Sequence, residues 1–260
     1  MFPWTIRQPY SSRNPRPAVG SQPIECLRCN APVTGTDDIC LVLFCRRPAA
    51  GVGKQRLAGT VGREAAAEVA RLMLAAAVED LEDWPGPVAL ATEKAEDGDW
   101  ARALLPRACE VVAQPEGNLG MRLNAADREL RDRGMQRLVF IGSDAPELQP
   151  DDYRAAREQM ESSDVVLGPA LDGGVTLMGA NAPWPDLEPL PWSTDRLGAA
   201  LAQLCEDQGR RVAQIEPRAD VDVVTDLQRL PESLQDDPRP ARQALLRRWE
   251  QKGRRLVPAA

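Results

Sequence analysis

The sequence predicts an α/β fold of three layers, α/β/α, built around a mainly parallel sheet. The first observation behind this prediction is that short, continuous apolar runs alternate with segments of helical periodicity. Continuous apolar runs are typical of strands that are buried on both faces of a parallel sheet. The second observation is composition, because 260 residues with a hydrophobic fraction of 43% can form one large domain, or two small ones, with a proper core.

The elements follow one another along the chain. The predicted strands share short apolar runs and lie at 39–45, 87–92, 109–113, 137–142, 164–168, 175–179 and 211–215. The predicted helices share an apolar period or helix-start residues and lie at 62–82, 99–105, 121–133, 151–161, 194–208, 225–230 and 240–253. In the first of these helices, Val69, Leu72 and Met73 recur with the spacing of one helix face. Asp151 is placed to cap the helix that it begins.

Composition divides the chain into three regions. Residues 1–36 are rich in Pro, Ser, Arg and Asn without sustained periodicity, which predicts a mobile N-terminal extension. Residues 37–235 carry the alternating strands and helices of the α/β domain. Residues 236–260 are expected to form a charged C-terminal helix and tail.

Charge and hydropathy exclude some classes of function. The net charge of -7 argues against non-specific binding of nucleic acid. No apolar run approaches the roughly 20 residues that span a bilayer, and the N-terminus lacks the apolar core of a signal peptide. The sequence therefore predicts a soluble, cytoplasmic protein without a membrane span.

The six cysteines do not form a regular framework. Cys26 and Cys29 form a CxxC pair, but a zinc site needs two further ligands and the chain has no histidine. Cys40 and Cys45 could supply them only if the first strand frayed. The CxxC pair is either a metal or redox site or two thiols in a tail segment, and buried thiols are the expectation for the others.

Ligands of open α/β sheets bind beyond the carboxyl ends of the strands, so the residues after each strand are the candidates for a site. After the first strand, Gly51 and Gly53 would let the backbone approach a ligand closely. Lys54 and Arg56 could reach phosphates, the lysine as a point charge and the arginine in a bidentate way. A plain surface turn would explain the same residues.

The loop after the third strand carries amide side chains and glycines. Gly117 and Gly120 bracket a tight loop at a helix start. Gln114 and Asn118 suit the recognition of a base or a sugar hydroxyl. A plain strand-to-helix turn is the alternative.

Acidic residues follow the later strands. Asp144 ends an apolar strand, where it could bind Mg²⁺ or Mn²⁺ or merely cap a turn. Asp220 and Asp222 would share one face of an extended segment, and they repel each other unless a cation or a proton lies between them. Asp226 is expected to begin a helix. Asp172 lies in a glycine-rich turn that a hairpin alone would explain.

Six segments in one order resemble a known family. They read AGVGKQRLA, QPEGNLG, IGSDAPEL, GPALDGGVTLMG, PWST and DVDVVTDLQRL, and they span about 39–230. They resemble the motifs of the bacterial glycosyltransferases associated with radical-SAM/selenodomain proteins, formerly a domain of unknown function. The chain departs from that family at Gln55, where threonine is usual, at Asn118, which replaces an aspartate, and at Val175 and Thr176, which replace an aromatic pair.

The resemblance implies a nucleotide-diphospho-sugar transferase (GT-A-like) fold and a role for each motif. Nucleotide-binding residues would come from the first and third strand ends, and they are Gly51, Lys54, Arg56, Gln114, Asn118 and Gly120. Asp144 and Asp222 would hold Mg²⁺ or Mn²⁺, which stabilises a leaving diphosphate. Asp172 and Lys54 are the catalytic candidates, with Asp172 as the base for the acceptor.

The PWST motif offers an acceptor side. Trp192, Ser193 and Thr194 could contact the acceptor. Equally, Ser193 or Thr194 could cap the following helix while Trp192 packs beneath it.

Three functions fit these residues. The first is a metal-dependent glycosyltransferase that uses a nucleotide sugar and a small-molecule acceptor. The second is a nucleotidyltransferase that takes an NTP and a phosphorylated or phosphonate acceptor, since one fold serves both reactions. The third is a non-catalytic nucleotide-binding protein. The sequence does not specify the sugar, the base, the acceptor or the oligomeric state.

Overall fold

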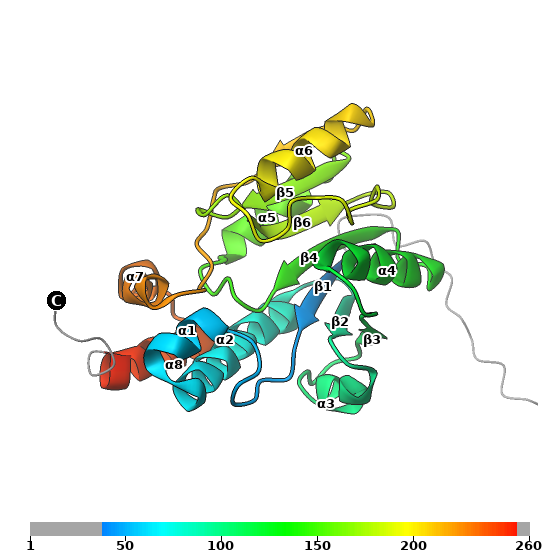
Figure 1. Cartoon of the computed structure of the whole chain (residues 1–260). Coiled ribbons are helices and arrows are strands. Elements are labelled where there is room, and N and C mark those ends of the chain that lie inside the picture. The colour runs from blue at the N-terminus through cyan, green and yellow to red at the C-terminus, as the bar shows by residue number, and fades with distance from the viewer. Residues whose placement is uncertain (1–37, 254–260) are drawn as a thin grey trace, which may run out of the picture. The chain divides into compact units, whose positions relative to one another are not determined.

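The computed structural model describes residues 38–253 and contains one seven-stranded sheet (Figure 1). The strands are β1 (Ile39–Cys45), β2 (Val88–Thr92), β3 (Glu110–Ala113), β4 (Arg137–Gly142), β5 (Val165–Pro169), β6 (Val175–Ala180) and β7 (Val212–Gln214). Their spatial order is β3-β2-β1-β4-β6-β5-β7, and β6 is antiparallel to both of its neighbours while the other pairs are parallel. The predicted mainly parallel sheet is confirmed.

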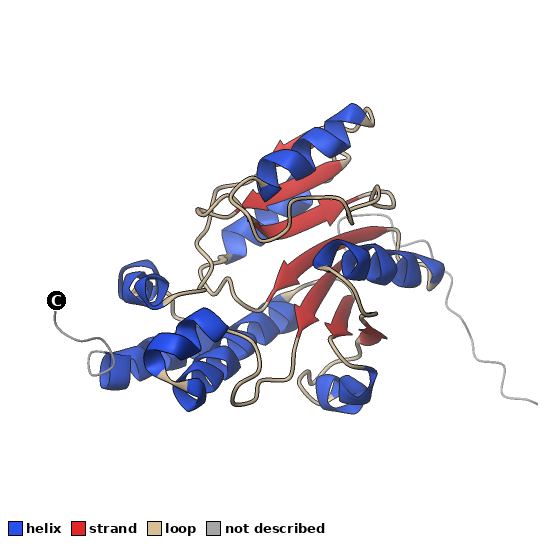
Figure 2. Cartoon of the chain, in the orientation of Figure 1, coloured by secondary structure: helices blue, strands red, loops and turns tan. Residues whose placement is uncertain are grey.

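Helices lie between successive strands except β5 and β6, which a turn connects, as the colouring by secondary structure in Figure 2 shows. The α-helices are α1 (Gln55–Val61), α2 (Arg63–Asp83), α3 (Gly98–Arg102), α4 (Leu119–Asp132), α5 (Pro150–Gln159), α6 (Leu197–Asp207), α7 (Val224–Leu234) and α8 (Pro240–Arg248). The short turns η2 (Ala95–Asp97) and η3 (Trp249–Gly253) complete the elements. None of the helices between residues 38 and 253 is long and apolar enough to cross a membrane.

Alternation along β1 shows how the three layers form. Leu41 and Leu43 belong to a core cluster that includes side chains of α2, α3 and α5. Cys40 and Val42 point the other way and pack with side chains of α4 and α6. Because successive side chains of a strand face opposite sides, one apolar run supplies both cores. Burial raises the pKa of Cys40 to about 12, so this thiol stays protonated and acts as a core residue.

A third apolar cluster joins helices beyond the carboxyl edge of the sheet. Leu57 of α1 and Met73 of α2 pack there with Leu230 of α7 and Leu245 of α8. Val221 also belongs to this cluster, and it is flanked by the two aspartates Asp220 and Asp222. The cluster thus fixes the segment that carries these carboxylates.

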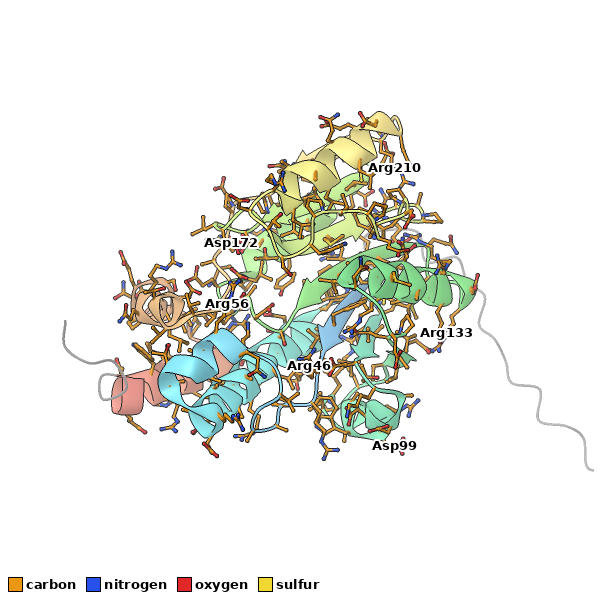
Figure 3. The ribbon with its side chains drawn as sticks, viewed as in Figure 1. Arg46, Arg56, Asp99, Arg133, Asp172 and Arg210 are labelled. Atoms are coloured by element: carbon orange, nitrogen blue, oxygen red, sulfur yellow. The ribbon has the colours of Figure 1, made fainter. Side chains whose placement is uncertain are left out.

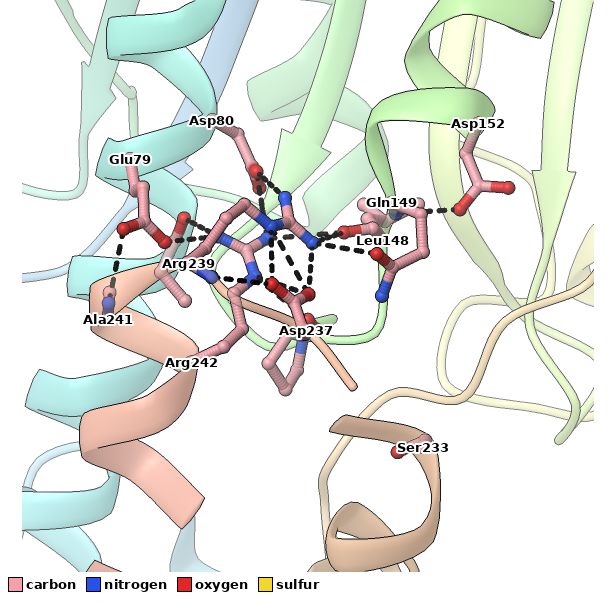
Figure 4. A network of polar contacts seen from close by, with 12 residues as sticks. Glu79, Asp80, Leu148, Gln149, Asp152, Ser233, Asp237, Arg239, Ala241 and Arg242 are labelled. Atoms are coloured by element: carbon pink, nitrogen blue, oxygen red, sulfur yellow. Dashed lines mark hydrogen bonds and ion pairs between the residues drawn. The ribbon is translucent and has the colours of Figure 1, made fainter. Parts of the chain in front are cut away.

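The C-terminal helix α8 is held to α2 by buried ion pairs (Figure 4). The side chain of Arg242 is fully buried, and it donates to both carboxylate oxygens of Asp80 at 2.7 and 2.8 Å. Arg239 donates to Asp80 and to Asp237. Both arginines also donate to the carbonyl oxygen of Leu148. The network therefore joins α8, α2 and the loop between β4 and α5.

The structure corrects several predicted helix ends. The prediction that Asp151 caps its helix was wrong, since α5 begins at Pro150 and Gln149 is the capping residue. The carboxylate of Asp152 accepts from the backbone N–H of Gln149 at 2.8 Å, which leaves no role for Asp151 in the cap. The alternative that Ser193 or Thr194 caps the following helix was also wrong, because α6 begins at Leu197 and its N-cap is Arg196.

Two further differences concern helices near the third cluster. Helix α1 was not predicted. Helix α7 runs through Pro231 to Leu234, beyond the predicted end at Leu230, because Leu234 is buried in the same cluster.

The expected helix-start role of Asp226 is confirmed, as its carboxylate accepts from the backbone N–H of Val223 at 2.8 Å. Cys26, Cys29 and the predicted extension 1–36 lie outside the described residues.

Candidate functional site

A cavity of about 440 Å³ opens at the carboxyl edge of the sheet. One residue just beyond each of four parallel strands lines it, and these residues are Arg46, Glu93, Gln114 and Asp144. Lys54, Asp220 and Asp222 also line it. The cavity therefore contains both cationic and acidic side chains at the edge where ligands of such sheets bind.

The acidic side of the cavity is assembled around the ammonium group of Lys54. Its Nζ lies 2.9 Å from Oδ1 of Asp222 and 3.3 Å from Oδ2 of Asp144. It also donates to the carbonyl oxygen of Val221. The backbone N–H of Val221 donates in turn to the carbonyl oxygen of Asp144 at 2.9 Å. The two predicted metal ligands are thus brought together, with a lysine cation between them.

The charges of this group shift its protonation equilibria. Burial opposes the charged form of Lys54, but Asp144 and Asp222 outweigh it and raise the pKa of the lysine. Burial, followed by the negative charge of Asp172, raises the pKa of Asp220 to about 6. Asp144 and Asp222 act on Asp220 in the same direction. The acidic groups on this side of the cavity therefore outnumber the single ammonium of Lys54.

The backbone before α1 takes an unusual path that brings Lys54 to the acids. Gly51 and Gly53 have φ values of 80° and 67°, a region that favours glycine. Lys54 itself has φ 46° and ψ 41°, which is uncommon for a residue with a side chain. The loop therefore holds Lys54 in a sparsely populated backbone conformation beside the acidic group.

A second charged group was missed by the sequence analysis. Arg46 pairs with Glu93, and Arg122 of α4 lies 3.8 Å from the same carboxylate. The guanidinium of Arg46 also lies over Gly53, where an added Cβ would be 3.2 Å from it. Arg46 was not among the residues selected after the first strand. Its position one residue after the strand was the signal that could have found it.

The amide residues predicted for nucleotide binding are partly engaged by the protein. Gln114 lines the cavity and donates to the carbonyl oxygen of Ala91 at 2.8 Å. Asn118 caps α4, since its Oδ1 accepts from the backbone N–H of Met121 at 3.0 Å. Gly120 lies inside α4 against the carbonyl of Leu187, where an added Cβ would collide. Close packing of α4 against the backbone at Leu187 thus explains why a glycine stands at position 120.

Other predicted residues lie apart from the cavity lining. Figure 3 labels Arg56 on α1 and Asp172 in the turn between β5 and β6. Arg56 is exposed and has no ion-pair partner among residues 38–253. Asp172 is exposed and accepts from the backbone N–H of Gly174 at 2.9 Å. Neither these two nor Gly51 lines the cavity.

The PWST segment divides between the cavity and its rim. Trp192 lines the cavity, and its indole N–H donates to the carbonyl oxygen of Leu187 at 2.9 Å. Ser193 has φ 62° and is exposed. The hydroxyl of Thr194 donates to the carbonyl oxygen of Pro191 at 2.7 Å, which forms a turn before α6. Only Trp192 of the three predicted acceptor residues is a wall of the cavity.

Asp144 and Asp222 suit a divalent metal by their chemistry. Carboxylate oxygens are the ligands that Mg²⁺ and Mn²⁺ prefer, and both side chains are more than 40% exposed. Between residues 38 and 253, however, no group of three or more Cys, Asp or Glu side chains is arranged around a metal position. The ammonium of Lys54 stands between the two carboxylates. A metal ion would fit this pair after the lysine moves away.

Comparisons with known proteins support the fold. Residues 74–194 match the model of a family described as "Uncharacterized protein conserved in bacteria (DUF2064)". No curated protein matches the chain.

Solved structures resemble the chain over most of its length. One is a "putative nucleotide-diphospho-sugar transferase" from Desulfovibrio desulfuricans G20, with 24% identity, a TM-score of 0.76, and coverage of 86% of this chain and 100% of that chain. Another is a cytidylyltransferase from Leptospira borgpetersenii serovar Hardjo-bovis (strain JB197), with 10% identity, a TM-score of 0.50, and coverage of 86% of this chain and 98% of that chain. The protein has a nucleotide-diphospho-sugar transferase-like α/β fold, as expected from its motifs.

Proposed function

We propose that the protein is a glycosyltransferase that uses a nucleotide-activated sugar, a divalent metal and a small-molecule acceptor. The observation that carries the proposal is that one cavity combines the cations Arg46 and Lys54 with the carboxylates of Asp144 and Asp222. A nucleotide diphosphate needs cations for its phosphates, and a metal that bridges to phosphates needs carboxylates. We further propose that the chain belongs to the radical-SAM/selenodomain-associated family and acts in the cytoplasm.

The nucleotide would bind along the first and third strand ends. Its proposed contacts are Gly51, Lys54, Arg56, Gln114, Asn118 and Gly120, as the motifs imply. The geometry adds Arg46 and Arg122, whose guanidinium groups share the carboxylate of Glu93 in the cavity. Guanidinium groups suit phosphate oxygens because they offer paired donors in one plane. A phosphate could therefore replace Glu93 as their partner.

Asp144 and Asp222 would hold Mg²⁺ or Mn²⁺ in this proposal. A bound divalent ion supplies charge stabilisation for a leaving diphosphate. Lys54 would act as a second cation beside that diphosphate, which is the basis of its proposed catalytic role. The protein's own residues would thus contribute both the metal ligands and a positive charge beside the diphosphate.

The transfer forms one bond and breaks another. The acceptor hydroxyl oxygen bonds to the anomeric carbon of the sugar, while the bond from that carbon to the phosphate oxygen breaks. The nucleoside diphosphate leaves with the electron pair, and the hydroxyl proton passes to a carboxylate, for which we propose Asp172. Trp192, Ser193 and Thr194 would then contact the acceptor, with the indole of Trp192 as a wall of the cavity.

Nucleotidyl transfer is the second candidate, because two cations flank one loop. Arg46 and Lys54 begin and end the loop between β1 and α1, an arrangement that would suit a triphosphate. In that reaction an acceptor phosphate or phosphonate oxygen bonds to the α-phosphorus, and pyrophosphate leaves with the electron pair. Binding of a nucleotide without turnover would be the third candidate.

A thermal-shift screen of nucleotide sugars and NTPs, with and without Mn²⁺, tests these candidates. A ligand at about 100 times its Kd adds roughly 2.7 kcal/mol to the stability of the folded state. We expect a Mn²⁺-dependent shift with a nucleotide sugar that is lost in Asp144→Asn. The matched control is Asp151→Asn, because Asp151 is an exposed carboxylate of α5 outside the cavity lining.

Turnover then separates the reactions. Release of a nucleoside diphosphate with an acceptor panel supports glycosyl transfer, while release of pyrophosphate from an NTP supports nucleotidyl transfer. Binding without either product supports the non-catalytic candidate. Absence of any metal-dependent shift would overturn the proposed function.

A further inference from the structure

Lys54 occupies the position between the two proposed metal ligands. Its Nζ contacts a carboxylate oxygen of Asp144 and one of Asp222, and only 13% of its side chain is exposed. These partners lie 90 and 168 residues away in the sequence, so the lysine joins three distant segments of the chain at the acidic side of the cavity. The ammonium group therefore substitutes for a bound cation in this arrangement.

A divalent ion and this ammonium cannot share the same place. Mg²⁺ and Ca²⁺ lie about 2.0–2.6 Å from their oxygen ligands, so an ion bound to the two carboxylate oxygens that Nζ contacts would stand where Nζ stands. A divalent ion and an ammonium group that contact the same oxygens also repel each other strongly. Metal binding by Asp144 and Asp222 thus requires that Lys54 leaves.

The loop before α1 is built in a way that permits this movement. Gly51 and Gly53 precede Lys54 with positive φ values, and Lys54 adopts the left-handed region without a glycine's freedom. Its position at the start of a seven-residue helix leaves the lysine at the end of an exposed loop. A change of φ at Lys54 would relieve its strain and swing the ammonium out of the acidic group.

A phosphate group gives the released ammonium a new partner. Arg46, at the other end of the same loop, lines the same cavity, so phosphates that approach Arg46 come within the region that Lys54 can reach. The phosphates would draw Lys54 away from Asp144 and Asp222, and the freed carboxylates would accept the metal. Nucleotide and metal would therefore favour each other's binding, as linkage requires.

We propose that Lys54 is a tethered cation that occupies the Asp144–Asp222 pair and excludes divalent metal until a nucleotide's phosphates draw it away. The link to the nucleotide rests on the proposed function. The exclusion of metal by Lys54 rests on the geometry of the three side chains alone. Before nucleotide binds, Lys54 would thus act as a positioning residue that holds the two carboxylates in place.

Binding of Mn²⁺ alone to the full chain tests the exclusion directly. Free Mn²⁺ is measured by its electron paramagnetic resonance signal during titration of the wild type, Lys54→Met and Lys54→Arg. We expect Lys54→Met to bind Mn²⁺ at least tenfold more tightly than the wild type, because the uncharged side chain leaves the carboxylates without their cation. Lys54→Arg keeps the charge and should stay close to the wild type.

The matched control is Lys94→Met, which removes an exposed lysine that is paired with Glu96 outside the cavity lining. Unchanged or weaker Mn²⁺ binding by Lys54→Met would overturn the proposal. If repulsion between the carboxylates unfolds this variant, Mn²⁺ must restore its circular dichroism spectrum, and failure to do so counts equally against the proposal. Tighter Mn²⁺ binding without turnover of any nucleotide sugar would retain the role of Lys54 and remove the proposed function.

Discussion

At the scale of single residues, Arg46, Lys54 and Arg56 follow β1 within eleven residues but have different surroundings. Arg46 and Lys54 line the cavity, while Arg56 is exposed on α1 outside its lining. The sequence selected Lys54 and Arg56 because both follow the glycines. It could not show that Arg46 would be paired with Glu93, a residue at the end of the next strand.

We predict that Arg46→Gln weakens nucleotide binding more than Arg56→Gln does. A hydrogen bond to a charged group contributes about 1.5–3 kcal/mol, so loss of the Arg46 contact should raise Kd by roughly tenfold to a hundredfold. Arg56→Gln should change Kd by less than about threefold, because its guanidinium is surrounded by solvent. Isothermal titration with whichever nucleotide gives a thermal shift measures both. A larger loss in Arg56→Gln than in Arg46→Gln would contradict this prediction.

At the scale of elements, packing decides what local sequence leaves open. Helix α1 has only seven residues, follows Lys54 in a left-handed conformation and contains Gly59. It is too short for a sustained period of apolar residues to predict it. Its helical form depends on Leu57 and Val61, which are buried against α2 and α7. By contrast β1 and β4 were predicted with their observed ends, because runs of buried apolar residues are themselves the signal of a central strand.

Two glycines inside helices should respond in opposite ways to alanine. Gly120→Ala would place a Cβ against the carbonyl of Leu187 and 2.7 Å from Nε1 of Trp192, so we expect a loss of about 1–3 kcal/mol in the free energy of unfolding. Gly59→Ala is the matched control, since no atom lies within 4 Å of the added Cβ. It should raise stability by about 0.5–1 kcal/mol through helix propensity. Urea unfolding measures both, and a neutral Gly120→Ala would contradict the packing role of this glycine.

At the scale of the whole described region, topology brings distant acids to one place. The sequence predicted which strands end in polar residues, and the parallel sheet gathers Arg46, Gln114 and Asp144 at one edge. It also predicted that Asp220 and Asp222 would repel each other unless a cation or a proton lay between them. It could not show that Lys54 would lie between Asp222 and Asp144, because that pairing depends on how the segment after β7 packs on the third apolar cluster.

The attachment of the C-terminal helix to the rest of the α/β region should depend on pH. Asp237 is buried before α8, and its carboxylate accepts from Arg239, which also holds Asp80 of α2. Burial opposes the ionised form of Asp237, but the hydrogen bonds and charge of Arg239 hold its pKa below the ordinary value of 3.8. A carboxyl whose pKa is lower in the folded state stabilises the protein above its unfolded pKa. This contribution is lost as the pH falls through the folded value.

We therefore expect Asp237→Asn to lower the free energy of unfolding by about 1–3 kcal/mol at pH 7, because Arg239 loses a charged partner. The difference from the wild type should narrow as the pH falls below about 3.8, because the carboxyl takes up a proton in the unfolded wild type before it does so in the folded state. Urea unfolding between pH 7 and pH 3 gives both values. Asp132→Asn, at an exposed carboxylate of α4 with no ion pair among residues 38–253, removes the same charge and should show neither effect. A difference for Asp237→Asn that stays constant down to pH 3 would mean that its carboxylate charge does not hold α8 in place.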